Sequence, residues 1–415
     1  MSEFLEENKQ IAGVLYPDNK YLFLQKGDKK MNNSSLTTRL ILGAVLGAAA
    51  AALAFLGNPA NMALCIACFI RDTAGSMKMH SAAVVQYFRP EVVGIVCGAF
   101  LISVATKEYR STSGSSPMIR FLLGVIMMIG SLVFLGCPLR LLLRLSAGDL
   151  NAVVALPGFV LGIFTGTLAL KRGFTLGRAY PTKNSSGFVL PGLLVFLFVL
   201  SLTTTLFVSS ESGPGSKHAP IAAALIAGLV FGAVAQKSRT CFAGGFRDVI
   251  LMRNFDLLSV LGGLFVVMLV FNLATGGFKL SFAGQPVAHS QHIWNFLGMY
   301  VVGFAAVLAG GCPLRQLVLA GQGSSDSAVT FLGLLVGAAF CHNFGLAASA
   351  AAAATETAEA VAGGPGPAGK AAVLICIAVL FLIGFLPSRE KKYMKQAFRK
   401  QIGRSKKQKR GQNYV

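Results

Sequence analysis

Charged residues are scarce in this sequence of 415 residues. Asp, Glu, Lys and Arg make up 13 % of the chain, about half the share of a soluble domain, while hydrophobic residues make up 54 %. There are only five His and one Trp, and the 16 acidic residues face 37 Lys and Arg. So little charge excludes an ordinary soluble globular protein and indicates a chain that lies largely in lipid.

The net charge of +21 would suggest nucleic-acid binding in a soluble protein. Here the basic residues lie between apolar runs and in the last 28 residues, which hold 11 Lys or Arg against one Glu. No aromatic-rich basic fold accompanies them. We therefore exclude nucleic acid as a partner and interpret the charge as an orientation signal and a contact with anionic membrane lipid.

Ten apolar runs are long enough, or nearly so, to span a bilayer, which takes about 17–25 residues. They are uniformly apolar rather than one-sided. The sequence predicts an all-α polytopic membrane protein with spans at 37–57, 91–106, 118–136, 150–170, 188–209, 219–236, 256–275, 293–311, 328–348 and 370–387.

Basic residues alternate between the loops in a way that predicts orientation. Placing both termini in the cytoplasm puts the most basic loops inside, with 71–90 as an exception outside. The first ten residues lack the basic and apolar regions of a signal peptide. We expect a multi-pass protein of the inner membrane, with cytoplasmic tails at 1–36 and 388–415.

The chain repeats itself at a shift of about 175 residues. CIACFIRD at 65–72 matches CFAGGFRD at 241–248, and GCPLR occurs at both 136–140 and 311–315. Five spans in each half would make the second half enter the membrane upside down. The sequence thus predicts an inverted repeat of 37–209 and 219–387, with four short half-helix segments, an architecture common in transporters.

Each GCPLR segment predicts a break in a span. Pro138 and Pro313 disrupt a helix interior but suit the first position of a new one. Cys137 and Cys312 would lie at the breaks, facing a helix N-terminus suited to anions. Arg140 and Arg315 follow by one turn, where they would favour thiolate. The alternative is an Arg that reaches for the interface beside a Cys that only fills space.

Cys65 and Cys241 open the other repeated motif and would face the same cavity. Arg71 and Arg247 follow six residues later, each before an Asp, and we expect structural ion pairs there. Cys68 completes a C-x-x-C, but its counterpart in the repeat is a glycine, so we treat it as secondary. No second C-x-x-C accompanies it, so zinc is not expected.

The remaining candidates are weaker. We expect Cys97 and Cys376 to pack within spans, and Asp149 and Asp326 to cap helices or turns. Cys341 and His342 are secondary site candidates, and we favour a hydrogen-bonded core histidine. The segment GPGPAGK at 364–370 has P-loop spacing but lacks the Ser or Thr and the preceding strand, so no nucleotide or other cofactor is expected.

The repeated GCPLR, the stretch SRTCFAGGFRD at 238–248 and AGQGSSDS at 320–327 resemble the YeeE/YedE family of bacterial membrane proteins. The resemblance covers most of 36–390 and is strongest to the YedE-like selenium branch. It implies thiosulfate-type uptake, in which buried cysteines pass an anion inward through transient S–H···S hydrogen bonds. Carried over, Cys137, Cys241 and Cys312 come first, with Cys65 as symmetry mate. A TusA-like sulfur carrier is an implied partner.

We therefore expect a transporter of a small sulfur- or selenium-containing solute rather than an enzyme. Two alternatives stay open. One is a membrane thiol oxidoreductase or sulfurtransferase that uses a cysteine nucleophile. The other is a scaffold or channel whose four cysteines bind a soft metal.

Overall fold

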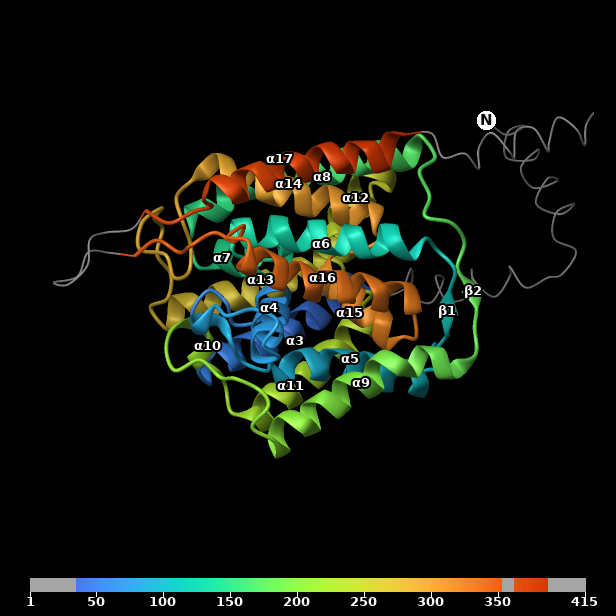
Figure 1. The fold of residues 1–415 in the computed structure, drawn as a ribbon, viewed down its shortest axis with the longest axis horizontal. Helices are drawn as coiled ribbons and strands as arrows, with labels where there is room; N and C mark the ends of the chain where they lie inside the picture. Colours follow the sequence, from blue (N-terminus) through green and yellow to red (C-terminus); the bar gives the residue numbers. More distant parts are fainter. Residues whose placement is uncertain (1–34, 353–361, 387–415) are drawn as a thin grey trace, which may run out of the picture.

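The fold is all-helical and belongs to a polytopic membrane protein. The computed structural model describes residues 35–352 and 362–386, so the predicted tails lie almost wholly outside the described residues. Most helices run side by side in one bundle (Figure 1). The long helices are α3 (Leu36–Phe55), α5 (Pro90–Ala105), α6 (Pro117–Phe134), α8 (Leu150–Lys171), α9 (Asn184–Thr203), α11 (Ile221–Lys237), α13 (Asp256–Ala274), α14 (His292–Leu308), α16 (Ser325–Asn343) and α17 (Pro367–Phe385).

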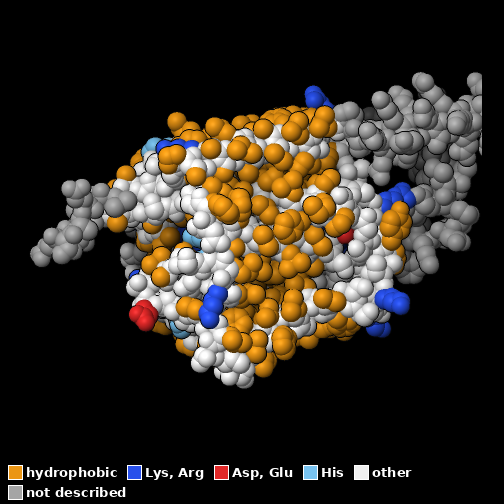
Figure 2. Space-filling view, viewed as in Figure 1, with side chains coloured by type: hydrophobic (Ala, Val, Ile, Leu, Met, Phe, Trp, Pro, Cys, Tyr) orange, Lys and Arg blue, Asp and Glu red, His pale blue; other side chains and the backbone are white. Residues whose placement is uncertain are grey.

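Ten stretches of the described chain are long and apolar enough to cross a membrane, which confirms the predicted number of spans. The helices begin and end within a few residues of most predicted bounds; α9 and α16 end earlier than predicted, at Thr203 and Asn343. Apolar side chains cover the middle of the molecule on the face that Figure 2 shows, and most of the visible Lys and Arg lie toward its ends. This is the surface that a bilayer requires.

Short elements fill the gaps between the long helices. Four short helices begin within the repeated motifs: α4 (Ile66–Ser76), α7 (Pro138–Ser146), α12 (Phe242–Met252) and α15 (Pro313–Gly321). The connecting loops contain η2 (Ala83–Val85), α10 (Gly213–Ser216) and the two-residue strands β1 (Thr112–Ser113) and β2 (Tyr180–Pro181). The strands pair antiparallel, with Thr112 opposite Pro181.

The order of elements from α3 to α9 recurs from α11 to α17. Helix packing follows the same relation: α3 contacts α13 while α5 contacts α11, and α6 contacts α16 while α8 contacts α14. Each of these eight helices therefore packs mainly on a helix of the other half. The bundle is held together by contacts between the halves rather than within them.

Glycine allows these helix pairs to approach closely. A Cβ placed on Gly98 of α5 would lie 2.1 Å from the Leu229 carbonyl oxygen, and one on Gly232 of α11 would lie 2.1 Å from that of Ile95. Between membrane helices, such close packing replaces the hydrophobic driving force that water supplies elsewhere. The interface of α5 and α11 thus tolerates no side chain at these two positions.

Two faces of the bundle are defined by their loops. The β-pair face holds the loops 106–116 and 172–183, joined by β1 and β2. The opposite face holds the loops 77–89, 204–220 and 275–291, where the Ser210 amide donates to the Gln86 carbonyl over 2.7 Å. These names are used below for the two ends of the bundle.

We predict that Gly232→Ala lowers the stability of the protein, because the new methyl group must push α11 away from α5. Overpacking of this kind costs about 1–3 kcal/mol. The control is Gly262→Ala in α13, where a Cβ would have nothing within 4 Å. Thermal unfolding of both variants in detergent tests this, and an equal shift in Tm for the two would contradict it.

Candidate functional site

Each of the four short helices begins directly after a cysteine. Cys65 and Cys241 are the N-cap residues of α4 and α12, and their sulfur atoms accept hydrogen bonds from the amides of Cys68 (3.4 Å) and Gly244 (3.2 Å). Cys137 and Cys312 precede Pro138 and Pro313, which start α7 and α15 as predicted. The sequence therefore places all four thiols at helix N-termini, where the backbone dipole favours negative charge.

The four thiols form two pairs. The first thiol pair is Cys65 and Cys137, whose sulfur atoms lie 3.9 Å apart. The second thiol pair is Cys241 and Cys312, also 3.9 Å apart. Exposed fractions are 0 % for Cys65, 1 % for Cys137 and Cys312, and 7 % for Cys241. The structure thus brings the four predicted cysteines together in two pairs. In each pair, one cysteine lies at a break in a membrane helix (Cys137 or Cys312) and the other lies at the end of a loop (Cys65 or Cys241).

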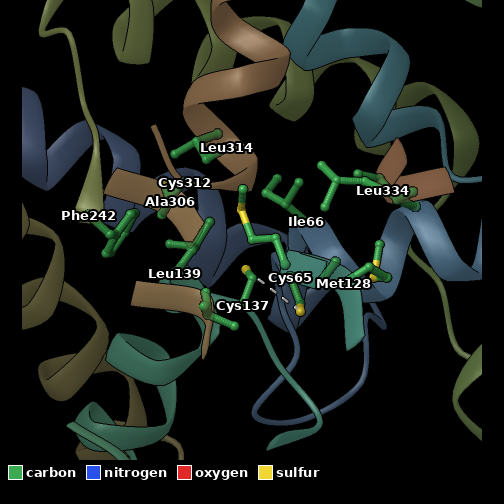
Figure 3. Close-up of a cluster of buried hydrophobic side chains, with 14 of the residues drawn as sticks. Cys65, Ile66, Met128, Cys137, Leu139, Phe242, Ala306, Cys312, Leu314 and Leu334 are labelled. Carbon is green, nitrogen blue, oxygen red and sulfur yellow. Dashed lines mark hydrogen bonds between the residues drawn. The ribbon is translucent and has the colours of Figure 1, made fainter. Parts of the chain in front are cut away.

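The surroundings of the thiol pairs are apolar. Figure 3 shows Cys65 and Cys137 linked by a hydrogen bond, with the apolar side chains of Leu139 and Ile66 near them and Cys312 further away. All belong to one cluster of buried hydrophobic residues. A thiol is a weak donor and a weak acceptor, so such a site favours a soft, polarisable solute and releases it readily.

Arg140 has no free donor near the first thiol pair. Its Nε donates to the Asn61 carbonyl (2.8 Å), Nη1 to the Leu135 carbonyl and the Cys68 sulfur (3.6 Å), and Nη2 to the carbonyls of Pro286 (3.4 Å) and Val287 (3.0 Å). These bonds use all five N–H groups of the guanidinium. Arg140 is fully buried. It acts on the site through its charge and its contact with Cys68, not through a direct bond to Cys137.

Arg315, the counterpart of Arg140, is placed differently. It is half-buried and its Nη1 donates to Gln236 Oε1 over 3.4 Å. Gln236 is itself buried at the end of α11. The two arginines that look equivalent in the sequence thus differ: the first is saturated by backbone carbonyls, and the second is held by one long bond to a side chain.

The Arg-Asp couples also differ between the halves. Asp72 is buried between Arg71 (2.7 Å) and Arg89 (2.8 Å), and these side chains are at most 3 % exposed. Arg247 pairs with Asp248 over 2.9 Å, with exposed fractions of 30 % and 17 %. Both couples are ion pairs, as expected. The buried cluster explains the basic loop at 71–90: Arg71 and Arg89 neutralise a carboxylate and do not count as surface charge.

Sequence reasoning missed several buried charges around the first thiol pair. Arg144 of α7 is fully buried, binds Asp149 over 2.6 Å and donates to the Phe134 carbonyl over 2.9 Å. Glu91 is also fully buried and accepts from Asn58 over 2.9 Å. These polar residues were visible in the sequence, but no local pattern showed that they are buried or which groups they bind.

His289 holds the loop whose carbonyls bind Arg140 in place against α6. His289 is 1 % exposed, its Nε2 bonds to the Val133 carbonyl over 2.8 Å, and its Nδ1 accepts from the Gln291 amide over 3.2 Å. Burial lowers the pKa of His289 to about 4, so the ring is neutral at pH 7. It holds the loop of residues 285–291 against α6.

The secondary candidates lie outside the thiol pairs. Cys341 is buried in α16, and His342 stacks on His80 with ring centres 4.5 Å apart. His342 Nε2 has no hydrogen-bond partner within the described chain, so the expected hydrogen-bonded histidine is wrong. Asp149 caps α8 as expected, whereas Asp326 accepts from the amides of Gly114 and Ser115 while Ser324 caps α16.

Cys97 and Cys376 lie within α5 and α17, as expected. Residues 35–352 and 362–386 contain no group of three or more His, Cys, Asp or Glu side chains placed to hold a metal ion.

Comparison with known proteins points to one family. Residues 237–414 match the family described as "Sulphur transport". A stretch of 113 residues is 32 % identical to the thiosulfate transporter TsuA of Spirochaeta thermophila, and covers 26 % of this chain and 33 % of that protein. A stretch of 122 residues is 30 % identical to the thiosulfate transporter TsuA of Escherichia coli, and covers 29 % and 33 %. These matches span about a third of the length of each relative.

We predict that Asp72→Asn destabilises the protein strongly, because it leaves two buried guanidinium groups without their carboxylate. Breaking a buried pair costs about 3–5 kcal/mol. The repeat supplies the control: Asp248→Asn breaks the exposed pair, which is worth about 0–1 kcal/mol. Thermal unfolding in detergent measures both, and similar losses in the two variants would refute the structural role of the buried cluster.

We also predict that acid loosens the loop of residues 285–291. The folded pKa of His289, about 4, lies below its ordinary value of 6.5, so the released loop binds a proton that the packed loop cannot. The packing of the loop is therefore fully stable above pH 6.5 and weakens as the pH falls toward 4. Amide hydrogen exchange of 285–291, corrected for its intrinsic pH dependence, should rise over this range in the wild type but not in His289→Gln. A pH-independent rate in both would count against it.

Proposed function

We propose that the protein is a membrane transporter for a small sulfur-containing anion, since residues 237–414 match the sulphur-transport family, in agreement with the resemblance to YeeE/YedE proteins. The observation that carries the proposal is the arrangement of four buried cysteines in two pairs at helix N-termini. In this proposal the anion passes from one thiol pair to the other. Thiosulfate is the first candidate, since the matched relatives are named for it.

The charge around the path supports an anionic solute. Four buried arginines of the first half face only three buried carboxyl groups: Arg71, Arg89, Arg140 and Arg144 against Asp72, Glu91 and Asp149. A surplus of positive charge in a medium of low dielectric attracts an anion strongly. Arg315, with a single long bond to Gln236, is the arginine best placed to reorient toward the solute.

The thiol pairs support a weak, multi-site path. Transport requires binding that is strong enough to admit the solute and weak enough to release it. Thiols donate weak hydrogen bonds, and the terminal sulfur of thiosulfate is a large, soft acceptor. The two thiol pairs, both set in an apolar core, would bind the anion one after the other without trapping it.

The proposed topology follows the sequence. We assign residues 37–209 and 219–387 to two inverted membrane repeats, with both termini in the cytoplasm and the protein in the inner membrane. The β-pair face would then be cytoplasmic. A basic tail at 388–415 would meet anionic lipid, and a TusA-like carrier would receive sulfur at this side. Selenium compounds are a second solute class, suggested by the YedE-like resemblance.

The alternatives predict different chemistry. A thiol oxidoreductase or sulfurtransferase would trap a persulfide or mixed disulfide on one cysteine, and Arg140 and Arg315 would serve its thiolate. A transporter should instead lose only movement of the solute when a path thiol is removed. We favour transport because the matched proteins are transporters and because each half supplies one pair of thiols from two short helices, with the same 3.9 Å between the sulfur atoms.

The test is uptake of labelled thiosulfate, selenate and selenite into cells that lack their own transporters. We expect thiosulfate to accumulate with the wild type and to fall by at least about tenfold with Cys312→Ala, because one hydrogen-bond partner of the anion is lost. Cys97→Ala is the control, since Cys97 lies on α5 outside both thiol pairs. Accumulation of selenium anions alone would change the solute. No accumulation of any of the three, with protein present in the membrane, would contradict the proposal.

A further inference from the structure

The first thiol pair has a third thiol beside it. The sulfur atoms of Cys65 and Cys68 lie 2.8 Å apart, closer than the 3.9 Å that separates Cys65 from Cys137. Both side chains are fully buried. Arg140 Nη1 donates to the Cys68 sulfur over 3.6 Å. Cys68 therefore belongs to the surroundings of the proposed path without being one of its paired thiols.

The geometry of the helix permits a disulfide between them. Cys65 is the N-cap of α4 and Cys68 is three residues further, on the next turn. Side chains three apart on a helix have Cβ atoms about 5–6 Å apart, and the N-cap has freedom to close the rest of the way to the 3.5–4.5 Å of a disulfide. The helix would not have to unwind.

The second half of the chain lacks this pair. At the same place in α12, Gly244 stands three residues after Cys241, and its amide donates to the Cys241 sulfur over 3.2 Å. A Cβ on Gly244 would already lie 3.0 Å from the Cβ and 3.3 Å from the sulfur of Cys241. The second thiol pair has no neighbouring thiol with which Cys241 could close a disulfide along its own helix.

We propose that Cys65 and Cys68 form a reversible disulfide site that responds to small peroxides and closes the path at the first thiol pair. One thiol attacks the peroxide oxygen, becomes a sulfenic acid and releases water; the other thiol attacks that sulfur and displaces a second water. In sum, two thiols and one hydrogen peroxide give one disulfide and two waters. The sulfur atoms are oxidised and the peroxide oxygens are reduced.

Peroxide has a route to these thiols. A cavity of about 350 Å³ lies between α3, α7 and α13, and its lining includes Asn61, Ala63 and Pro286. The carbonyls of Asn61 and Pro286 bind Arg140, which in turn contacts Cys68. Arg140 therefore lies between this cavity and Cys68, and a small peroxide that enters the cavity reaches Cys68 when the Arg140 side chain is displaced.

The consequence for transport rests on the proposed function. A disulfide removes the S–H donor of Cys65, so the first thiol pair keeps only Cys137. Because Gly244 stands at the position of Cys68 in α12, the second thiol pair cannot form the corresponding disulfide along its own helix. Oxidation should therefore stop transport at the first thiol pair, and a reductant should restore transport.

The experiment has two independent arms. In the first, purified full-length protein in lipid nanodiscs is treated with hydrogen peroxide, alkylated and mapped by mass spectrometry. We expect a Cys65–Cys68 disulfide that dithiothreitol reverses, while Cys241 and Cys312 remain alkylated. Free Cys65 and Cys68, or a Cys65–Cys137 disulfide in their place, would overturn the assignment. This arm needs no transport activity, so it decides the disulfide even if the proposed function fails.

In the second arm, uptake of thiosulfate is measured before and after peroxide, with each variant compared with its own untreated rate. The wild type should lose most of its uptake and regain it with dithiothreitol, whereas Cys68→Ala should be insensitive. Cys341→Ala, which removes a buried cysteine from α16, is the control and should behave like the wild type. Equal inhibition of Cys68→Ala and wild type would overturn the effect on the path.

Discussion

The constraint on which this structure depends is the interruption of two membrane helices at Cys137 and Cys312. A break inside lipid frees backbone carbonyls that must find donors within the protein. In the first half, Arg140 and Arg144 bind the carbonyls of Leu135 and Phe134. In the second half, Gln316 binds those of Ala309 and Gly311, and Arg120 also binds Ala309. The first role of these buried polar side chains is to donate hydrogen bonds to the freed backbone carbonyls. The same interruptions place the thiols and the helix N-termini in the interior of the protein.

The two halves differ in how deeply their charged residues and thiols are buried, and this difference bears on function. In the first half, Arg140, Arg144, the ion pairs around Asp72 and both path thiols are buried almost completely. Arg140 also donates hydrogen bonds to the carbonyls of Pro286 and Val287, in a loop of the opposite face. The second half leaves Arg315, Arg247 and Asp248 partly exposed. If the halves are related by inversion, as we propose, the arrangement corresponds to a path more open toward the β-pair face. Proteins built from inverted repeats can exchange such environments between their halves.

The ten spans could be predicted from the sequence because a uniformly apolar run of this length between basic loops fits few structures other than a membrane-spanning helix. The sequence also predicted where α7 and α15 begin, since a Pro after a Gly-Cys step both ends one helix and starts another. It did not predict that Arg140 is saturated, that Arg89 joins Asp72, or that Arg144 is buried. Asp72 lies 17 residues from Arg89, and Val287 lies 147 residues from Arg140. Even the near partners of Arg144, Phe134 and Asp149, come together only because a break separates α6 from α7 and a turn follows α7. Local patterns show which residues are costly to bury, but only the fold shows what binds them.

The central claim is that the solute contacts the paired thiols. The most direct test is an experimental structure with bound selenosulfate, the thiosulfate analogue whose terminal sulfur is selenium, located by anomalous scattering. The account predicts selenium within hydrogen-bond distance of the sulfur of Cys137 or Cys312, in the apolar core between the short helices. Selenium found only beside Arg315 and Gln236, or only on the surface, with no thiol in contact, would contradict it.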